Sequence, residues 1–198
     1  ATQNGAIAAV NANAFWHLLD APEAEKKKGW YAGKTVRLFG LAVSDGVLRN
    51  PGQDIRTPLW LDAVGRTHVG HPASNDVPQQ AVADWEGPLL RDGKIATDDD
   101  KTPYPRTLAG TDKEGRYLLL AVADGKQNGV SEGLTLREAA AVMLEHGCSD
   151  AVNFDGGGSS VMLVDTKGHL HAVNSPCGGS YLRPIPVMLG IRLRKDKQ

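Results

Sequence analysis

A run of three glycines separates a carboxylate from two hydroxyls in the second half of the chain, and this combination favours a functional site over ordinary packing. The residues in order are Asn153, Phe154, Asp155, Gly156, Gly157, Gly158, Ser159 and Ser160. Glycine reaches positive φ at little cost, so such a loop can turn several N–H groups toward an anion or a sugar hydroxyl. Asp155 would then stand free for chemistry at a strand end. The alternative is a glycine-rich hairpin in which Asp155 caps the turn.

A second acidic residue, Asp124, is expected at the same sheet edge as Asp155. Residues 116–124 form a nearly continuous apolar run, which is typical of a strand buried on both faces. A helix is predicted at 135–147, with a capping box at its start and a glycine at its end. It leads into a strand at 150–154, so a right-handed crossover between neighbouring parallel strands is expected. Open sheets bind ligands at the C-terminal edge of such strands, where Asp124 and Asp155 would meet.

The rest of the chain is expected to supply short strands and short helices. The predicted elements are strands at 6–10, 34–44, 57–64, 87–94, 161–164 and 185–194, an interrupted helix at 14–28 and a short helix at 78–85. Apolar patterning and Asp-Gly turns indicate the strands. The predicted fold is therefore one α+β domain over residues 1–198, with a mixed β-sheet and packed helices.

Composition excludes several classes of partner. With 198 residues and 41% hydrophobic content the chain can bury a core, and its net charge of −1 offers no basic surface to nucleic acid. No apolar run approaches the roughly 20 residues that span a bilayer, so no membrane span is expected. The first residues lack the layout of a secretion signal.

Motifs for cofactors and metals are missing too. The sequence has neither a phosphate-binding loop nor a dinucleotide fingerprint, so no organic cofactor is expected. Its histidine pairs lack companion ligands, so no metal site is expected either. Cys148 and Cys177 either form a disulfide or remain thiols.

Eight segments, taken together and in order, resemble the phosphodiester glycosidase family. They lie at 8–11, 87–93, 105–107, 124–125, 133–136, 153–160, 174–176 and 183–186. The family commonly follows its first asparagine with two glycines and two aromatic residues, whereas here Asn11 is followed by Ala12, Asn13, Ala14, Phe15 and Trp16. This departure affects the shape of the sugar pocket more than the reaction.

The resemblance implies a hydrolase that cleaves a sugar C1–O bond, with a phosphate ester as the leaving group. The substrate would be a sugar-1-phosphodiester, such as one of N-acetylglucosamine, or a related cell-surface glycan, and the protein would be bacterial and extracytoplasmic. Such a reaction develops oxocarbenium character, which calls for a carboxylate beside the anomeric carbon. Asp155 is the first choice for this role and Asp124 the second.

The resemblance also implies residues that bind the substrate. A phosphodiester calls for a permanent cation that can contact two oxygens, and Arg106, with Thr107 beside it, is preferred over Arg183. Sugar hydroxyls or phosphate oxygens would be oriented by Asn11, Asn153, Gly156, Gly157, Gly158, Ser159 and Ser160. Among the four tryptophans, Trp16 is either a core residue or a platform for a sugar face.

A different class of function remains open. A fold does not guarantee its usual activity, so the chain could be a non-catalytic carbohydrate-binding or cell-wall-binding module. The presence of Asp155, Asp124 and Arg106 speaks against this alternative.

Overall fold

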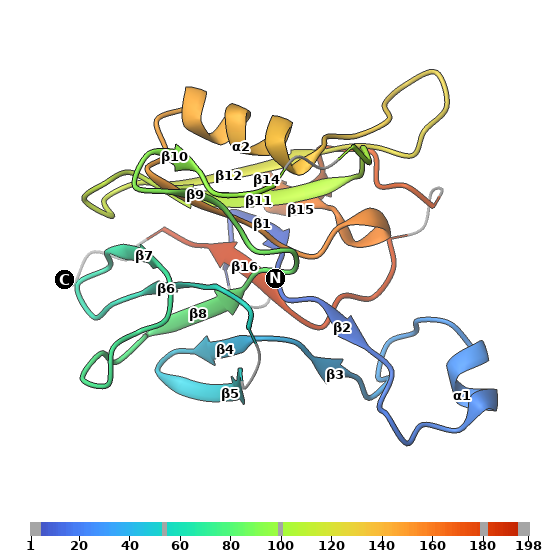
Figure 1. Cartoon of the computed structure of the whole chain (residues 1–198). Helices are drawn as coiled ribbons and strands as arrows, with labels where there is room; N and C mark the ends of the chain where they lie inside the picture. Colours follow the sequence, from blue (N-terminus) through green and yellow to red (C-terminus); the bar gives the residue numbers. More distant parts are fainter. Residues whose placement is uncertain (1–4, 53–54, 99–100, 179–181, 194–198) are drawn as a thin grey trace.

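The computed structural model describes residues 5–52, 55–98, 101–178 and 182–193, and within these ranges the protein is mostly β-structure (Figure 1). Its strands form four sheets in which every strand pair is antiparallel. The two described α-helices have five and ten residues. The predicted α+β class, with a mixed sheet and packed helices, is therefore wrong, because short antiparallel strands carry most of the structure.

The central sheet has five strands in the order β10-β9-β13-β11-β12. Their bounds are β9 Pro88–Arg91, β10 Lys94–Ile95, β11 Arg106–Thr111, β12 Leu118–Ala123 and β13 Asp150–Asn153. Helix α2 (Leu136–Glu145) covers one face of this sheet (Figure 1). Leu108 and Ala151 of the sheet pack there in one apolar cluster with Met143 of the helix.

The local signals for α2 are confirmed. Glu138 N donates to the Thr135 hydroxyl at 3.2 Å, and the Glu138 carboxylate accepts from Thr135 N at 2.8 Å, which is the predicted capping box. Gly147 follows the helix with φ +84°, a left-handed conformation that suits glycine at a helix end. Leu136, Ala139, Ala140 and Met143 form the buried stripe.

The predicted pairing of the strands on either side of α2 is wrong. β11 lies between β12 and β13 and runs antiparallel to both. β12 and β13 still point the same way, so Asp124 and Asp155 follow their strands at one edge of the sheet. No strand was predicted at residues 106–111, where β11 lies. For this reason β12 and β13 were expected to be neighbours.

The other face of the central sheet packs against two further sheets, ordered β15-β14-β1-β16 and β5-β4-β8-β6-β7. The first contains β1 Ala8–Asn11, β14 Met162–Thr166, β15 His169–Ala172 and β16 Met188–Ile191. The second contains β4 Leu41–Ser44, β5 Val47–Pro51, β6 Pro58–Leu61, β7 Thr67–Val69 and β8 Gln80–Ala83. Val10 of β1, Leu59 of β6 and Val152 of β13 lie in one core cluster, which joins the three sheets.

One predicted helix is shortened, and another is replaced by a strand. β2 (Phe15–Trp16) pairs with β3 (Arg37–Leu38), and only α1 (Glu23–Lys27) is helical within the helix predicted at 14–28. We call residues 15–38 the β2–β3 lobe, which projects from the body of the protein (Figure 1). The helix predicted at 78–85 is wrong, because β8 lies between β4 and β6 and buries Ala81, Val82 and Ala83. Pairing on both sides overrides local propensity in such a short segment.

None of the helices within the described ranges is long and apolar enough to cross a membrane.

Candidate active site

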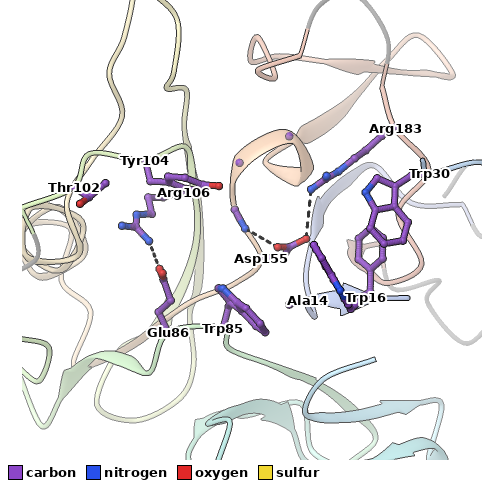
Figure 2. Close-up of a pocket in the computed structure, with 14 residues that line it drawn as sticks. Ala14, Trp16, Trp30, Trp85, Glu86, Thr102, Tyr104, Arg106, Asp155 and Arg183 are labelled. Carbon is purple, nitrogen blue, oxygen red and sulfur yellow. Dashed lines mark hydrogen bonds and ion pairs between the residues drawn. The ribbon is translucent and has the colours of Figure 1, made fainter. Parts of the chain in front are cut away.

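A cavity of about 570 Å³ opens at the edge of the central sheet, beside the β2–β3 lobe (Figure 2). Its volume is in the range of small-molecule binding sites. The lining residues are Ala14, Phe15, Trp16, Trp30, Trp85, Glu86, Thr102, Tyr104, Arg106, Asp155, Gly156, Gly157, Gly158 and Arg183. Of the predicted site residues, the structure thus brings Asp155, Arg106, Arg183 and the three glycines together around one space.

Asp155 lies just beyond the end of β13, and its main chain is held in place. Its N–H donates to the Ala12 carbonyl at 3.0 Å, and its own carbonyl accepts from Asn11 Nδ2 at 2.6 Å. The carboxylate accepts from Gly156 N at 3.0 Å and lies 3.9 Å from Arg183 Nη2. Its side chain is only 17% exposed, so the carboxylate faces a sheltered part of the cavity.

The surroundings of Asp155 shift its acidity. Burial is the largest influence and raises the pKa of the Asp155 carboxyl, and the negative charge of Glu86 raises it further. A hydrogen bond from the Ser159 hydroxyl, the Arg183 charge and the Gly156 N–H each lower the pKa and offset part of this rise. Such opposing influences on one carboxyl in a cavity are typical of functional sites.

Glu86 supplies a second carboxylate that the sequence analysis missed. It follows β8 in the linker to β9, and its side chain is 40% exposed. Arg106 Nη1 forms an ion pair with Glu86 Oε2, which also accepts from Asn153 Nδ2 at 3.3 Å. Its position directly before the 87–93 segment is the one signal that would have pointed to it.

The two guanidiniums of the cavity differ in exposure. The Arg106 side chain is 3% exposed, pairs with Glu86 and donates through Nε to the Leu134 carbonyl at 3.0 Å. The Arg183 side chain is 31% exposed and donates through Nε to Ser159 Oγ at 3.1 Å. Arg183 is therefore the more accessible cation for an incoming anion.

Most of the predicted polar ligands lie beneath the cavity. Asn11, Thr107, Asn153, Ser159 and Ser160 are all buried and do not line the cavity. Asn11 Oδ1 accepts from Thr107 Oγ1 at 2.6 Å and from Val161 N at 3.1 Å, while its Nδ2 holds the Asp155 carbonyl. We call Asn11, Thr107, Asp155 and Val161 the Asn11 network. It fixes the backbone that carries the Asp155 carboxylate.

The glycine loop approaches a neighbouring loop closely. A Cβ on Gly156 would lie 2.7 Å from the Pro105 carbonyl oxygen, and one on Gly157 would lie 3.0 Å from the Tyr104 hydroxyl. Four N–H groups of the loop donate within the protein, those of Gly156, Gly157, Ser159 and Ser160. Packing against the Tyr104 loop thus accounts for Gly156 and Gly157, and these four donors are not directed at a ligand.

The structure does not bring Asp124 to the cavity. Its carboxylate accepts from Asn174 Nδ2 at 2.8 Å and from Ser175 N at 2.9 Å. Asn174 Nδ2 also donates to the Ser160 carbonyl at 3.1 Å. Asp124 therefore ties the 174–175 loop to the segment after the glycines.

The cysteines are both free thiols, and Cys148 is buried. Burial, followed by the charges of Asp112 and Asp150, raises the pKa of the Cys148 thiol to about 11. Across the part of the chain that the structure describes, no three His, Cys, Asp or Glu residues are grouped so as to hold a metal ion.

Comparison with known proteins defines the class of protein. The model of the phosphodiester glycosidase family matches residues 4–192, and the chain therefore belongs to this family. None of the curated proteins compared with the chain matches it in sequence.

Two solved structures have a similar fold. One is the catalytic domain of zebrafish N-acetylglucosamine-1-phosphodiester alpha-N-acetylglucosaminidase, auto-inhibited by its pro-peptide, with a TM-score of 0.65 and 23% identity over 96% of this chain and 64% of that one. The other is a candidate exported protein from Burkholderia pseudomallei, with a TM-score of 0.59 and 17% identity over 95% of this chain and 66% of that one. The chain thus spans just under two thirds of the length of either protein.

Proposed function

We propose that this protein is a glycosidase that hydrolyses the C1–O bond of a sugar-1-phosphodiester or a related cell-surface glycan. Family membership supports the glycosidase class. The observation that carries the proposal is that two carboxylates, Asp155 and Glu86, line one cavity together with two guanidiniums. Glycoside hydrolysis commonly uses such a pair of carboxylates, and a departing phosphate needs a cation.

Asp155 is the group proposed to lie beside the anomeric carbon. Its charged form stabilises the positive charge that develops at C1 as the bond to the leaving oxygen breaks. The Asn11 network and the Gly156 N–H hold Asp155 in place before substrate arrives. This positioning matters because a displacement of about 1 Å at a catalytic group can cost 10²-fold in rate.

Glu86 is proposed as the base that activates water. Water attacks C1 and gives its proton to Glu86, while the leaving group departs as a phosphate monoester. Arg106 positions Glu86, since the two side chains form an ion pair. A phosphate ester leaves readily, so the reaction asks for little proton donation to the leaving oxygen.

Arg183 is proposed to contact the phosphate. It is more exposed than Arg106 and is directed by its bonds to Ser159. The first sugar to test is N-acetylglucosamine, because the similar zebrafish enzyme is named for it. We also propose an extracytoplasmic location, which agrees with the similarity to a candidate exported protein.

The test measures release of N-acetylglucosamine from its 1-phosphodiesters and from aryl glycosides. Asp155→Asn and Glu86→Gln should each lower kcat by about 10²- to 10⁴-fold, because each removes a charge that acts on the reacting atoms. Glu114→Gln is the matched control, since Glu114 is an exposed carboxylate on the turn between β11 and β12. Full activity in Asp155→Asn would refute the assignment, and sugar binding without any product would favour the binding-module alternative.

Asp124→Asn distinguishes the catalytic role predicted from the sequence from the loop-anchoring role indicated by the hydrogen bonds of Asp124. If Asp124 only anchors the 174–175 loop, the substitution should lower stability and activity together. A large loss of kcat at unchanged stability would restore the catalytic role that the sequence suggested.

A further inference from the structure

The central sheet ends in β12, an edge strand of six residues that contains neither a charged residue nor a proline. Edge strands of natural proteins are commonly short, or carry charges or proline, which keeps other chains from pairing with them. Several other edge strands of the described sheets follow this rule. β10 has two residues, β7 has three, and β5 contains Arg49 and Pro51. β12 therefore leaves an unprotected template for strand pairing.

The side chains of β12 are only partly covered on both faces of the sheet. All six residues are half-buried. Leu119 and Ala121 pack against the cluster beneath α2. Leu118, Leu120 and Val122 pack against the core that joins the three sheets. Both apolar layers thus end at this strand with part of their surface in water, and covering that surface would be favourable by about 25 cal/mol per Å².

The hydrogen bonds of β11 show which way the backbone of β12 faces. The Thr107 carbonyl accepts from Phe154 N at 2.8 Å, so the backbone groups of Thr107 are directed toward the β13 side. Because these directions alternate along a strand, the next residue, Leu108, is directed toward β12, where its partner is Ala121. Ala121 therefore uses its backbone groups within the sheet.

The alternate residues of β12 direct their backbone groups toward the open edge. These residues are Leu118, Leu120 and Val122, and each has one N–H and one C=O. No other described strand pairs with β12 on this side. Such groups recur at every second residue along the edge, and a further strand offers partners at the same spacing.

We propose that β12 pairs with β12 of a second copy of this chain, antiparallel and across a two-fold axis. An interface of this kind is isologous, so one strand supplies both of its sides. The outward N–H and C=O groups of each copy would bond to those of the other. The two central sheets would become continuous, and the apolar layers of each copy would cover the open ends of the other. The pairing is independent of the proposed function.

Charged residues near the ends of β12 select one register. With the axis at Leu120, Arg116 of one copy lies opposite Asp124 of the other. Moving the axis one residue toward the N-terminus would place Glu114 opposite Asp124. Moving it one residue the other way would place Arg116 opposite Lys126. Like charges directly opposite each other are destabilising, so the axis at Leu120 is favoured.

The two members of this charge pair are accessible to each other's copy. The Arg116 side chain is 63% exposed, and both ion pairs on its own turn are 3.4 Å long. The Asp124 carboxylate accepts from Asn174 Nδ2 and Ser175 N, which are both neutral donors. A guanidinium from the second copy would add a cation to this carboxylate. The proposed interface thus extends to the 174–175 loop.

The first test measures the mass of the full chain by sedimentation equilibrium over a range of concentrations. The wild type should reach twice the mass of one chain. Arg116→Glu should raise the dimer dissociation constant about three- to thirtyfold, since two ion pairs across the axis become like-charge contacts. Arg49→Glu makes the same charge change at an exposed residue of the edge strand β5 and should leave the constant unchanged. A monomeric wild type, or equal effects of the two substitutions, would overturn the pairing.

The second test uses cross-linking to locate the axis, in a Cys177→Ser background whose remaining thiol, Cys148, is buried. Leu120→Cys places two thiols opposite each other in a hydrogen-bonded pair, whose Cα atoms lie about 5.5 Å apart, within reach of a disulfide. This variant should form a disulfide-linked dimer under mild oxidation. Leu118→Cys is the matched control, since Leu118 lies on the same face but opposite Val122. Its two thiols would be too far apart to bond.

Cross-linking of Leu118→Cys as readily as Leu120→Cys would refute the two-fold pairing at Leu120. Thermal unfolding of each cysteine variant checks that it is folded before oxidation. Arg116→Glu changes an exposed residue, so the sedimentation test decides the question even if a strand variant does not fold. A wild type that stays monomeric would leave this edge to a strand from elsewhere and would rule out the second copy as its partner.

Discussion

Replacement of Asn11 by leucine should destabilise the protein strongly, because Asn11 satisfies three buried groups with a side chain of nearly the same shape as leucine. Asn11 is 0% exposed. It pairs with the Asp155 carbonyl, the Thr107 hydroxyl and the Val161 N–H. Leaving a buried polar group without a partner costs about 1–3 kcal/mol, so the three together should lower the free energy of unfolding by about 3 kcal/mol or more.

Thr107→Val provides the calibrated comparison. It removes one of these bonds and leaves Asn11 Oδ1 paired with Val161 N. The expected loss is about 1 kcal/mol, which corresponds to a Tm lower by about 2–4 °C in a chain of this size. The ratio of the two losses in free energy of unfolding tests the Asn11 network. This ratio depends on how many hydrogen bonds each variant removes rather than on the strength of one bond.

The assay is urea unfolding of the two variants and the wild type, followed by tryptophan fluorescence. Asn11→Leu should also lower kcat, because the Asp155 main chain loses the Asn11 donor, whereas Thr107→Val keeps that donor and should lower kcat less. If Asn11→Leu costs no more than Thr107→Val, the Asn11 network does not stabilise the site in the way described. A rise in KM at unchanged stability would instead indicate direct contact of Asn11 with substrate.

Three further predictions concern the charge at Asp155 and the glycines. Arg183→Met should move the acid limb of the pH–activity profile to higher pH, because the Arg183 charge lowers the pKa of Asp155 and activity is lost as pH falls through that pKa; a limb that stays in place would contradict this. Asp155→Asn should be at least as stable as the wild type at pH 7, because the raised pKa of Asp155 means that its ionised form weakens the fold. This advantage in stability should shrink as pH falls, since the protonated form of Asp155 does not weaken the fold. In thermal unfolding, Gly133→Ala should lower the free energy of unfolding by about 1–3 kcal/mol more than Gly129→Ala. Both glycines have positive φ, but only a Cβ on Gly133 would meet the Tyr104 backbone, at 2.3 Å. Equal losses of stability would argue against close packing at Gly133.

Elements with a purely local signal were predictable from the sequence. The capping box of α2 involves residues three apart, and the turn glycine Gly147 follows directly. The Asp45-Gly46 and Asp92-Gly93 turns have the positive φ angles of tight hairpins. In each case the interaction that stabilises the element lies within a few residues, so pattern alone reveals it.

Elements stabilised by distant partners were not predictable. The sequence of β8 resembles that of a short helix, but its burial between β4 and β6 makes it a strand. β11 was not expected as a strand, and its place between β12 and β13 changed which strands are neighbours. In an antiparallel sheet, a strand can lie between two strands that are far from it in sequence. Local propensity does not depend on these partners, so it cannot predict the order of the strands.

The candidate site divides in the same way. The sequence by itself determined the family, through eight segments in order, and pointed to Asp155, Arg106 and Arg183. Only the tertiary structure decided that Glu86, Trp16 and Trp30 share a cavity with Asp155, that Asn11 and Thr107 lie beneath it, and that Asp124 is turned to another loop. The physical reason is that residue type limits what a side chain can do, whereas the folded backbone decides whether it faces a ligand or the protein interior.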